Sequence, residues 1–414
     1  MTTDSVPVID LGRARHSAAG TLAVAEQIDE ANQHIGFLAL ANHGVPEALL
    51  QRMYDVTAEF FALPIEEKLR VQGSKDTTRG YIPPKRRALA RTRGVGTPAD
   101  LVEFFSIGLP EVPQGDPWFA RGRQRGYFAD NQWPNSPNCF RETWEEYYRA
   151  MAALAVEVMQ LFAVALDLDQ HYFDSVVDSP ISNLFANRYP PLTGSPEPGQ
   201  LRVGEHTDYG SLTLLYQPDT VGGLEVCLDD EWFPVDPIAG SFVVNIGDLM
   251  ARWTNDRWIS TLHRVQLPSV SGPASRRISL PFFCQPNYDA VIDTLPTCMR
   301  VGVGSRYDAI TAGLNVSEKP TRASTCSRRP WAGSGCGDGC TAPATLSGRL
   351  THPAGMPRLR PMPQCVACLS ASRLPHSVQE RTRWPSTRSA DHAAFPESEP
   401  DHRGVRCRWQ GAAE

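Results

Sequence analysis

The sequence predicts an α+β protein in which an α-rich N-terminal part precedes an antiparallel β-barrel of the jelly-roll kind. In the first part of the chain, apolar residues recur at helical spacing in three segments. From Ser182 onward, short apolar runs alternate with Gly, Pro, Asp and Asn, a pattern typical of strands joined by turns. A barrel built in this way can enclose a cavity for a small ligand.

Size and charge narrow the classes of function. The chain has 414 residues and a formal net charge of −6, which argues weakly against a nucleic-acid partner. We find neither a secretory leader at Met1 nor an uninterrupted apolar run of about 18 residues, so we expect neither secretion nor membrane insertion. We therefore expect a cytoplasmic monomer whose partner is a small molecule.

Two strands and two helices are predicted at the N-terminal end. Val6–Leu11 and Phe37–Leu40 are expected to form short strands. An amphipathic helix before Gly36 and another after Pro46 are predicted from apolar residues at helical spacing. These residues are Leu22, Ala25, Ile28, Ala31 and Ile35 in the first helix, and Leu49, Leu50, Met53, Val56 and Phe60 in the second. His43 lies in the turn between them and is interpreted as structural.

The middle of the chain begins with a basic, irregular stretch inside Arg79–Gly108. We interpret it as a solvated loop or, alternatively, as a flap that recognises an anionic substrate. Its end, Asp100–Gly108, is strand-like, and a long helix with one buried face is predicted over about Arg141–Leu166. Further strands are predicted at Leu184–Tyr189, Leu212–Tyr216, Gly223–Val226, Trp232–Val235, Phe242–Ile246, His263–Leu267 and Ile278–Phe283.

The composition changes abruptly near Gly313. Residues 314–414 carry 14 Lys and Arg against 8 Asp and Glu, and hold six of the ten cysteines. We therefore divide the chain into a mixed helical region at 1–175, a barrel core at 176–313 and a tail at 314–414. A reading-frame shift near Gly313 is the preferred hypothesis for the tail, and a natural disordered tail is the first alternative. The second alternative is a zinc module built from Cys336, Cys340, Cys365 and Cys368.

A candidate metal site is predicted around Gly204–Leu215. His206 and Asp208 are two residues apart, so in a strand their side chains would point to the same face. His263 follows 263 − 206 = 57 residues later, in another β-like run. Two histidines and one carboxylate form the facial triad that holds non-haem Fe(II) and leaves coordination positions open. These three residues are therefore predicted metal ligands.

A candidate carboxylate anchor follows shortly after His263. Arg277 and Ser279 also have i, i+2 spacing, so a guanidinium and a hydroxyl would share one strand face. A guanidinium binds a carboxylate through two hydrogen bonds, and the hydroxyl can add a third. Tyr189, in the segment Asn187–Pro191, offers a phenol at a strand end.

Each of these features also has a structural interpretation when it is taken alone. A histidine is often satisfied inside a core, and Arg277 could be a surface charge. Their order and spacing together favour a metal site that works with a carboxylate ligand. Phe282 and Phe283 follow the anchor and are expected to line the wall of the cavity.

The chain resembles the isopenicillin N synthase-like branch of the Fe(II)/2-oxoglutarate-dependent dioxygenases, over about Val6–Gly313. The segments that carry the resemblance are VPVIDL at Val6–Leu11, GFLALANHGVP at Gly36–Pro46, FFALPIEEK at Phe60–Lys68, RGY at Arg79–Tyr81, EFFSIG at Glu103–Gly108, NRYPP at Asn187–Pro191, HTDYGSLTLLYQ at His206–Gln217, GGLEV at Gly222–Val226, NIGDLMARWTNDRW at Asn245–Trp258, STLHRV at Ser260–Val265 and RISLPFF at Arg277–Phe283.

The resemblance implies a double-stranded β-helix core, which is a cupin-like jelly roll, with helices packed outside it. It implies Fe(II) bound by His206, Asp208 and His263, with O2 as a further substrate. It also implies 2-oxoglutarate as co-substrate, chelated to the iron and held at its distal carboxylate. The residues implied for this co-substrate are Arg277, Ser279, Tyr189 and Asn187.

The implied reaction is oxidation of a small-molecule metabolite, with decarboxylation of 2-oxoglutarate to succinate and CO2. Hydroxylation is the expected outcome, with desaturation and ring closure as variations known in the family, and specialised metabolism such as antibiotic biosynthesis is the expected setting. Two alternatives stay open at this stage. One is an oxidase like isopenicillin N synthase, which uses iron and O2 without 2-oxoglutarate, and the other is an inactive barrel with an altered C-terminus.

Overall fold

The predicted mixture of helices and antiparallel strands is present in a computed structural model of the chain. The described residues are 6–317 except 74–77, 86–87, 91–93, 95, 193, 219–221, 270–271, 300–301 and 303. Within them, an eight-stranded sheet has the order β1-β2-β10-β7-β12-β5-β4-β3, and a four-stranded sheet has the order β6-β11-β8-β9. This arrangement agrees with the α+β class predicted from the sequence.

The N-terminal elements begin with a strand that pairs parallel to β2. The first long helix is capped by Ser17, whose hydroxyl accepts a hydrogen bond from the Gly20 amide. It ends before Gly36, which has a φ of +68° and so adopts the left-handed conformation that favours glycine. The elements are β1 (Val8–Asp10), the 3-10 turn η1 (Leu11–Arg15), α1 (Ala18–His34), β2 (Phe37–Ala41), α2 (Glu47–Ala62) and α3 (Ile65–Leu69).

The middle segment adds the outer strands of the large sheet and the longest helix. The strand predicted over Asp100–Gly108 is present as β4, and the helix predicted over Arg141–Leu166 is present as α5. The short helix α4 was not predicted, and neither was the strand β3, which lies at the start of the stretch interpreted as irregular. The elements are β3 (Gly80–Ile82), β4 (Glu103–Ile107), α4 (Pro117–Gln124), α5 (Phe140–Ala165) and the 3-10 turn η3 (Asp174–Val176).

The remaining strands complete both sheets and add a separate two-stranded sheet of β13 and β14. Each predicted run in this part of the chain overlaps an observed strand. The strands β13 and β14 and the helix α6, which lies between β10 and β11, were not predicted. The elements are β5 (Asn183–Tyr189), β6 (Val203–His206), β7 (Leu212–Tyr216), β8 (Leu224–Leu228), β9 (Glu231–Pro234), β10 (Phe242–Ile246), α6 (Asp248–Trp253), β11 (His263–Val265), η4 (Pro273–Ser275), β12 (Arg277–Cys284), β13 (Val291–Ile292), η5 (Pro296–Cys298), β14 (Ile310–Thr311) and α7 (Ala312–Ser317).

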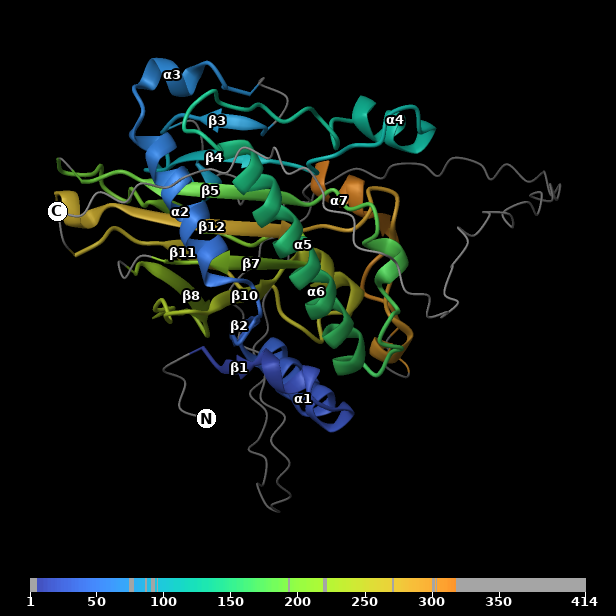
Figure 1. Cartoon of the computed structure of the whole chain (residues 1–414). Helices are drawn as coiled ribbons and strands as arrows, with labels where there is room; N and C mark the ends of the chain where they lie inside the picture. The colour runs from blue at the N-terminus through green and yellow to red at the C-terminus, as the bar shows by residue number, and fades with distance from the viewer. Residues whose placement is uncertain are drawn as a thin grey trace, which may run out of the picture. The chain divides into compact units, whose positions relative to one another are not determined.

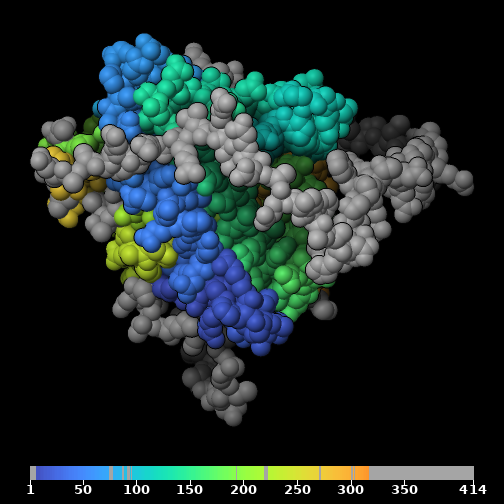
Figure 2. All heavy atoms as spheres, viewed as in Figure 1, coloured from blue at the N-terminus to red at the C-terminus, as the bar shows by residue number. Residues whose placement is uncertain are grey.

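The two faces of the large sheet have different roles because side chains alternate along each strand. On β7, Leu212 and Leu214 belong to the main hydrophobic core with α1, α2 and α5, whereas Thr213 and Leu215 face a cavity. Figure 1 shows α2 and α5 lying across the strands on the core side, and Figure 2 shows α1, α2 and α5 on the surface of that face. The opposite face therefore points toward the smaller sheet and lines the cavity.

The long helix α5 is apolar enough, by length and composition, to cross a membrane, with a mean hydropathy of 1.4 over 18 residues. The sequence expectation, which was based on an uninterrupted run, did not identify it. In the fold, Trp144, Met151, Val158 and Phe162 on this helix are completely or almost completely buried in the main core. A core helix of a folded domain passes the same composition test, so hydropathy is weak evidence for a membrane span here.

The predicted boundary at Gly313 falls inside α7. This helix continues to Ser317, and Asn315 is buried and donates a hydrogen bond from its side-chain amide to the Tyr209 carbonyl, at 3.1 Å. The rest of the predicted tail, 318–414, lies outside the described residues, as do the four cysteines considered for zinc.

Candidate active site

The two predicted histidine ligands lie directly opposite each other on paired strands. β6 and β11 are antiparallel, and His206 is the Cα partner of His263 in their register. The ring centroids are 4.2 Å apart. Strand pairing therefore brings together two residues that are far apart in the sequence.

Asp208 reaches the same point by a route that differs from the predicted one. β6 ends at His206, so Asp208 lies in the turn toward β7 and does not share a strand face with His206. The Asp248 amide fixes this turn by donating to the Asp208 carbonyl at 2.8 Å. Gly247 packs so closely that a Cβ there would lie 2.3 Å from the Gly210 carbonyl oxygen. Thr207–Gly210 are not part of a strand, so the backbone of the turn, and not strand alternation, orients the Asp208 side chain.

The three side chains present their ligand atoms to one point. The Asp208 Oδ1 atom is 3.9 Å from His206 Nε2 and 3.7 Å from His263 Nε2, and the three ligand atoms all lie within 4.8 Å of one another. The Nδ1 atom of His206 is 2.8 Å from the Gly204 carbonyl, and that of His263 is 3.0 Å from the Thr261 carbonyl. A carbonyl at Nδ1 selects the Nδ1–H tautomer, so each Nε2 atom carries the lone pair that can bind a metal.

The second oxygen of Asp208 is held by the protein. Thr213 Oγ1 donates to Oδ2 at 2.6 Å, and Asn245 Nδ2 donates to it at 2.7 Å. Burial raises the pKa of the Asp208 carboxyl, but His263 and His206 and these two hydrogen bonds lower it, so that the net pKa lies below its ordinary value. The carboxylate can therefore give one oxygen to a metal while the other stays bound to the barrel.

All seven predicted site residues line one cavity of about 110 Å³ between the two sheets. The predicted co-substrate residues form cross-strand pairs, because β12 and β5 are antiparallel: Arg277 is opposite Tyr189, and Ser279 is opposite Asn187. These four side chains are therefore neighbours on the cavity face. The predicted residues in the lining are Asn187, Tyr189, His206, Asp208, His263, Arg277 and Ser279.

The anchor end of the cavity is rich in hydrogen-bond donors that lack partners. Arg277 and Ser279 are each 1% exposed, and one terminal nitrogen of Arg277 donates to Gln217 Oε1. Among the described residues, the Nε and Nη1 atoms of Arg277 have no partner. The same holds for the Nε2 atom of Gln217, which contacts Arg277 but does not line the cavity. A carboxylate, which only accepts hydrogen bonds, fits this set of donors. The residues present therefore suit the distal carboxylate of 2-oxoglutarate.

Three phenylalanines from neighbouring strands form another wall of the cavity. The Phe104 and Phe185 ring centroids are 5.4 Å apart, and the Phe185 and Phe283 centroids are 5.3 Å apart. The prediction for Phe282 was wrong: its side chain points to the main core and contacts Tyr148. Adjacent residues of a strand face opposite sides, so only one of Phe282 and Phe283 can line the cavity.

Parts of Arg79–Gly108, which contains the stretch interpreted as a solvated loop or as a flap, also reach this cavity. Leu89, Asp100, Val102 and Phe104 line it, whereas Arg86, Arg87, Arg91 and Arg93 of the predicted flap lie outside the described residues. The Asp100 carboxylate accepts hydrogen bonds from the Leu89 and Gly204 amides, at 2.9 and 3.0 Å, so it joins this segment to β6.

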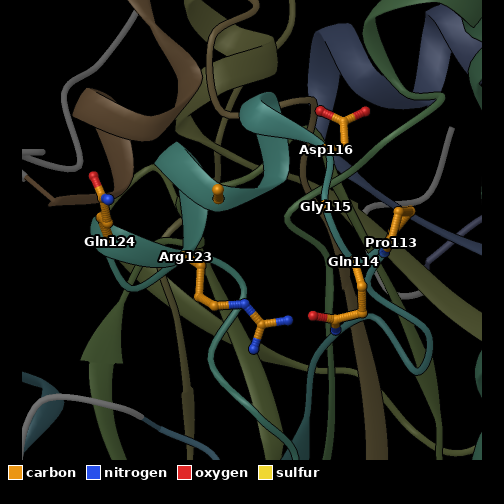
Figure 3. Close-up of a pocket in the computed structure, with 7 residues that line it drawn as sticks. Pro113, Gln114, Gly115, Asp116, Arg123 and Gln124 are labelled. Atoms are coloured by element: carbon orange, nitrogen blue, oxygen red, sulfur yellow. The ribbon is translucent and has the colours of Figure 1, made fainter.

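Two other places do not belong to the site. His43 is absent from the cavity lining; its Nδ1 accepts a hydrogen bond from the Val45 amide at 3.1 Å, and its ring packs on Phe242. A separate hollow of about 380 Å³ lies beside α4 and is lined by Asp116, Gln114 and Arg123, among others. The side chains of Gln114 and Arg123 point toward each other across it (Figure 3). None of the predicted site residues lines that hollow.

Sequence reasoning did not assign roles to Asn245, Thr213 or Gln217, although all three stand in segments quoted for the family resemblance. Asn245 and Thr213 face each other across the paired strands β10 and β7. The sequence signal for Asn245 was its position inside the NIGD segment. Its place opposite Thr213 and beside Asp208 became visible only when the strands were paired.

Comparison with known proteins agrees with this geometry. A family model described as non-haem dioxygenase in morphine synthesis N-terminal matches residues 6–136, and one described as 2OG-Fe(II) oxygenase superfamily matches residues 180–286. The chain is 34% identical over 320 residues to a 2-oxoglutarate-Fe(II) type oxidoreductase, hxnY, of Emericella nidulans, covering 75% of this chain and 88% of that protein.

Two further similarities are informative. The validamycin A dioxygenase of Streptomyces hygroscopicus subsp. limoneus is 35% identical over 321 residues, covering 77% of this chain and 86% of that protein. The crystal structure of a full-length Neurospora crassa protein in complex with alpha-KG has a TM-score of 0.66 and 32% identity, covering 76% of this chain and 95% of that chain. A structure of the same Neurospora crassa protein with alpha-KG and thymine has a TM-score of 0.66 and 31% identity, covering 76% of this chain and 96% of that chain.

The fold and the cavity thus define a non-haem iron oxygenase with a jelly-roll core, as the sequence predicted. The chain belongs to the isopenicillin N synthase-like family of 2OG-Fe(II) oxygenases. It is a 2-oxoglutarate-dependent dioxygenase that uses Fe(II) and O2.

Proposed function

We propose that the protein hydroxylates a small, partly apolar metabolite in the cavity between its two sheets. In this proposal His206, Asp208 and His263 bind iron. Arg277, Ser279, Tyr189 and Asn187 hold 2-oxoglutarate. One observation carries the proposal: the metal-binding group, the unpaired donors of the anchor and the aromatic wall all line the same cavity.

Bound iron, 2-oxoglutarate and O2 supply the oxidising chemistry: one oxygen atom enters the metabolite as a hydroxyl, and the other enters succinate as CO2 leaves. The protein supplies orientation. The Gly204 and Thr261 carbonyls hold the imidazoles of His206 and His263 so that each Nε2 atom points to the proposed iron position. Thr213 and Asn245 keep one oxygen of Asp208 away from that point. The phenylalanine wall keeps water from the reacting region.

The aromatic wall supports a substrate with a flat or apolar part, since Phe104, Phe185 and Phe283 present ring surface to the cavity. The names of similar proteins support a small molecule: one is named for validamycin A, and one was crystallised with thymine. These names are also the support for specialised metabolism, such as antibiotic biosynthesis, as the setting. Cytoplasmic location and a monomeric state stay predictions, which fractionation and light scattering would test.

Oxygen uptake and succinate formation test the proposal directly. The full chain, loaded with Fe(II) and 2-oxoglutarate, is screened against small metabolites with flat or apolar parts. A true substrate should raise O2 uptake, yield one succinate for each hydroxylated product and have no effect on His263→Ala. Substrate oxidation that does not depend on 2-oxoglutarate would contradict the proposal and favour the oxidase alternative.

A further inference from the structure

A second buried guanidinium lies beside the proposed anchor. Arg202 is 1% exposed, and its guanidinium carbon is 5.4 Å from the centroid of the Tyr189 ring. The guanidinium carbon of Arg277 is 4.8 Å from the same centroid. Two buried cations therefore lie against one phenol ring of the cavity wall, although only Arg277 and Tyr189 line the cavity.

Neither cation has a carboxylate partner among the described residues. Arg202 donates from one terminal nitrogen to the Ser275 carbonyl, while its Nε and Nη1 atoms have no partner. Burial, followed by repulsion from Arg277, lowers the pKa of Arg202 to about 10. A buried charge without a counter-charge is costly, so a ligand that brings negative charge to this end of the cavity would be stabilised there.

A purely structural role explains only part of this arrangement. The hydrogen bond to Ser275 fixes the turn η4 just before Arg277 begins β12. A neutral donor could make that bond without placing a second positive charge near Arg277. The contact with Tyr189 and the unpaired nitrogens point instead to an electrostatic role, because a dicarboxylate bound at Arg277 would supply the missing negative charge.

We propose that Arg202 is a positioning residue of the co-substrate anchor, which supports Tyr189 and adds a second positive charge behind it. The pair Arg202 and Arg277 would then favour 2-oxo acids that carry a distal carboxylate over those with a neutral tail. Arg202 acts through the ring and through space, since it does not line the cavity. This inference rests on the proposed assignment of Arg277 as the anchor.

The test compares two ligands that differ in the distal charge. Dissociation constants of 2-oxoglutarate and of 2-oxopentanoate, its neutral-tailed analogue, are measured anaerobically by the charge-transfer absorbance of the Fe(II)-loaded full chain. Arg202→Met should weaken 2-oxoglutarate roughly tenfold and leave 2-oxopentanoate within about twofold, because only the former carries the charge that Arg202 attracts. Arg202→Lys, which keeps the charge, should retain most of the preference.

Two variants make the outcomes distinguishable. Arg79→Met is the matched control, because Arg79 is also buried, has a pKa lowered by burial to about 10 and lies outside the cavity lining. It should leave the ratio of the two constants unchanged. Arg277→Gln tests the anchor itself and should abolish most of the preference.

The inference about Arg202 is overturned if Arg202→Met weakens both ligands equally, or if Arg202→Lys loses the preference as fully as Arg202→Met. It is also overturned if Arg277→Gln changes the ratio of the constants and Arg202→Met does not, in which case the anchor assignment stands. If Arg277→Gln also leaves the ratio unchanged, the proposed assignment of the anchor itself fails.

Discussion

At the scale of single residues, the two oxygens of Asp208 have separate tasks. Oδ1 faces the two histidine Nε2 atoms, and Oδ2 accepts hydrogen bonds from Thr213 and Asn245. A carboxylate held in this way binds a metal through one oxygen and leaves coordination positions for 2-oxoglutarate and O2. The hydrogen bonds to the ligand are therefore expected to set the affinity for iron.

The first prediction concerns Asn245. Asn245→Ala should weaken Fe(II) binding by about tenfold to a hundredfold, because Asp208 loses a hydrogen bond that orients it. Competition with a chromogenic chelator measures this affinity, and circular dichroism checks the fold. Asn287→Ala is the control, since Asn287 is also buried and hydrogen-bonded, to Asp178 and Ser179, but is not in the cavity lining. Unchanged iron affinity in Asn245→Ala would remove this role.

The second prediction concerns His43 and pH. Burial, the largest cause, lowers the pKa of His43 below its ordinary value of 6.5. Below about pH 6.5, the unfolded chain therefore binds more protons than the native state. The stability that neutral His43 contributes to the fold is lost as the pH falls from about 6.5 toward the lower pKa of the folded state. His43→Asn keeps an acceptor for the Val45 amide. It should show a smaller fall in Tm between about pH 7.5 and about pH 5 than the wild type; an equal fall would contradict the prediction.

Much of the site could be predicted at this scale, and the reason is chemical. The types and spacing of His206, Asp208, His263, Arg277 and Ser279 were sufficient to predict one shared site, and the structure places all five in one cavity lining. Their roles as metal ligands and carboxylate anchor stay predictions. Arg202 and Asn245 were not assigned, because an arginine or asparagine acquires a role only from its spatial neighbours. Those neighbours come from segments that are distant in the sequence, such as Ser275 for Arg202 and Asp208 for Asn245.

At the scale of secondary-structure elements, one buried ionic group joins four elements behind the cavity wall. The Glu103 carboxylate on β4 accepts hydrogen bonds from Lys68 Nζ on α3 at 2.9 Å, from the Tyr81 hydroxyl on β3 at 2.5 Å and from Arg188 on β5. Glu103 is 2% exposed and Lys68 is 6% exposed. The neighbours of Glu103 and Arg188 on the opposite strand faces, Phe104 and Asn187, line the cavity. This group therefore fixes the strands that carry them.

The third prediction tests this ionic group. Glu103→Gln should lower the free energy of unfolding by about 3–5 kcal/mol, because Lys68 and Arg188 lose their buried counter-charge. Urea denaturation measures the change. Glu67→Gln is the control, because its partner Arg70 is 69% exposed and such surface pairs contribute about 1 kcal/mol or less. A similar small loss in both variants would show that the buried group does not hold the strands together.

The elements themselves were predicted unevenly. The long helices and the main barrel strands were located correctly, since α1, α2 and α5 show helical periodicity and the barrel strands show turn residues at both ends. The strands β3, β13 and β14, of two or three residues each, were not predicted. The short helices α3, α4 and α6 were missed because five to eight residues give too little periodicity. The turn that carries Asp208 was taken for a strand because an i, i+2 spacing also fits a turn with its own backbone contacts.

At the scale of the whole molecule, the chain separates into a unit of residues 1–330 and the remainder. All buried residues of the three hydrophobic clusters lie between Ile9 and Ala312. The last described element, α7, contacts the turn after Asp208 through Asn315. The end of the described chain is thus connected to the turn that carries Asp208.

The fourth prediction concerns the length of chain that the site requires. A chain ending at Pro330 should keep its Tm within about 2 °C of the full chain and should keep its iron affinity. A chain ending at Thr311 should lose iron affinity, because it lacks Asn315 and the rest of α7. Differential scanning calorimetry and chelator competition measure both. A large fall in Tm for the chain ending at Pro330 would show that later residues stabilise the domain.

The pairing of His206 with His263 also has a consequence for the lifetime of the protein. β6 is an edge strand of four residues, and β11 has three, so few backbone hydrogen bonds hold this corner. A metal ion bound to both strands would act as a cross-link that closes a loop of more than fifty residues. Iron-free molecules should therefore exchange amide hydrogens and be cut by proteases first at this corner. The cell's iron supply would then govern how long each molecule survives as well as how fast it works.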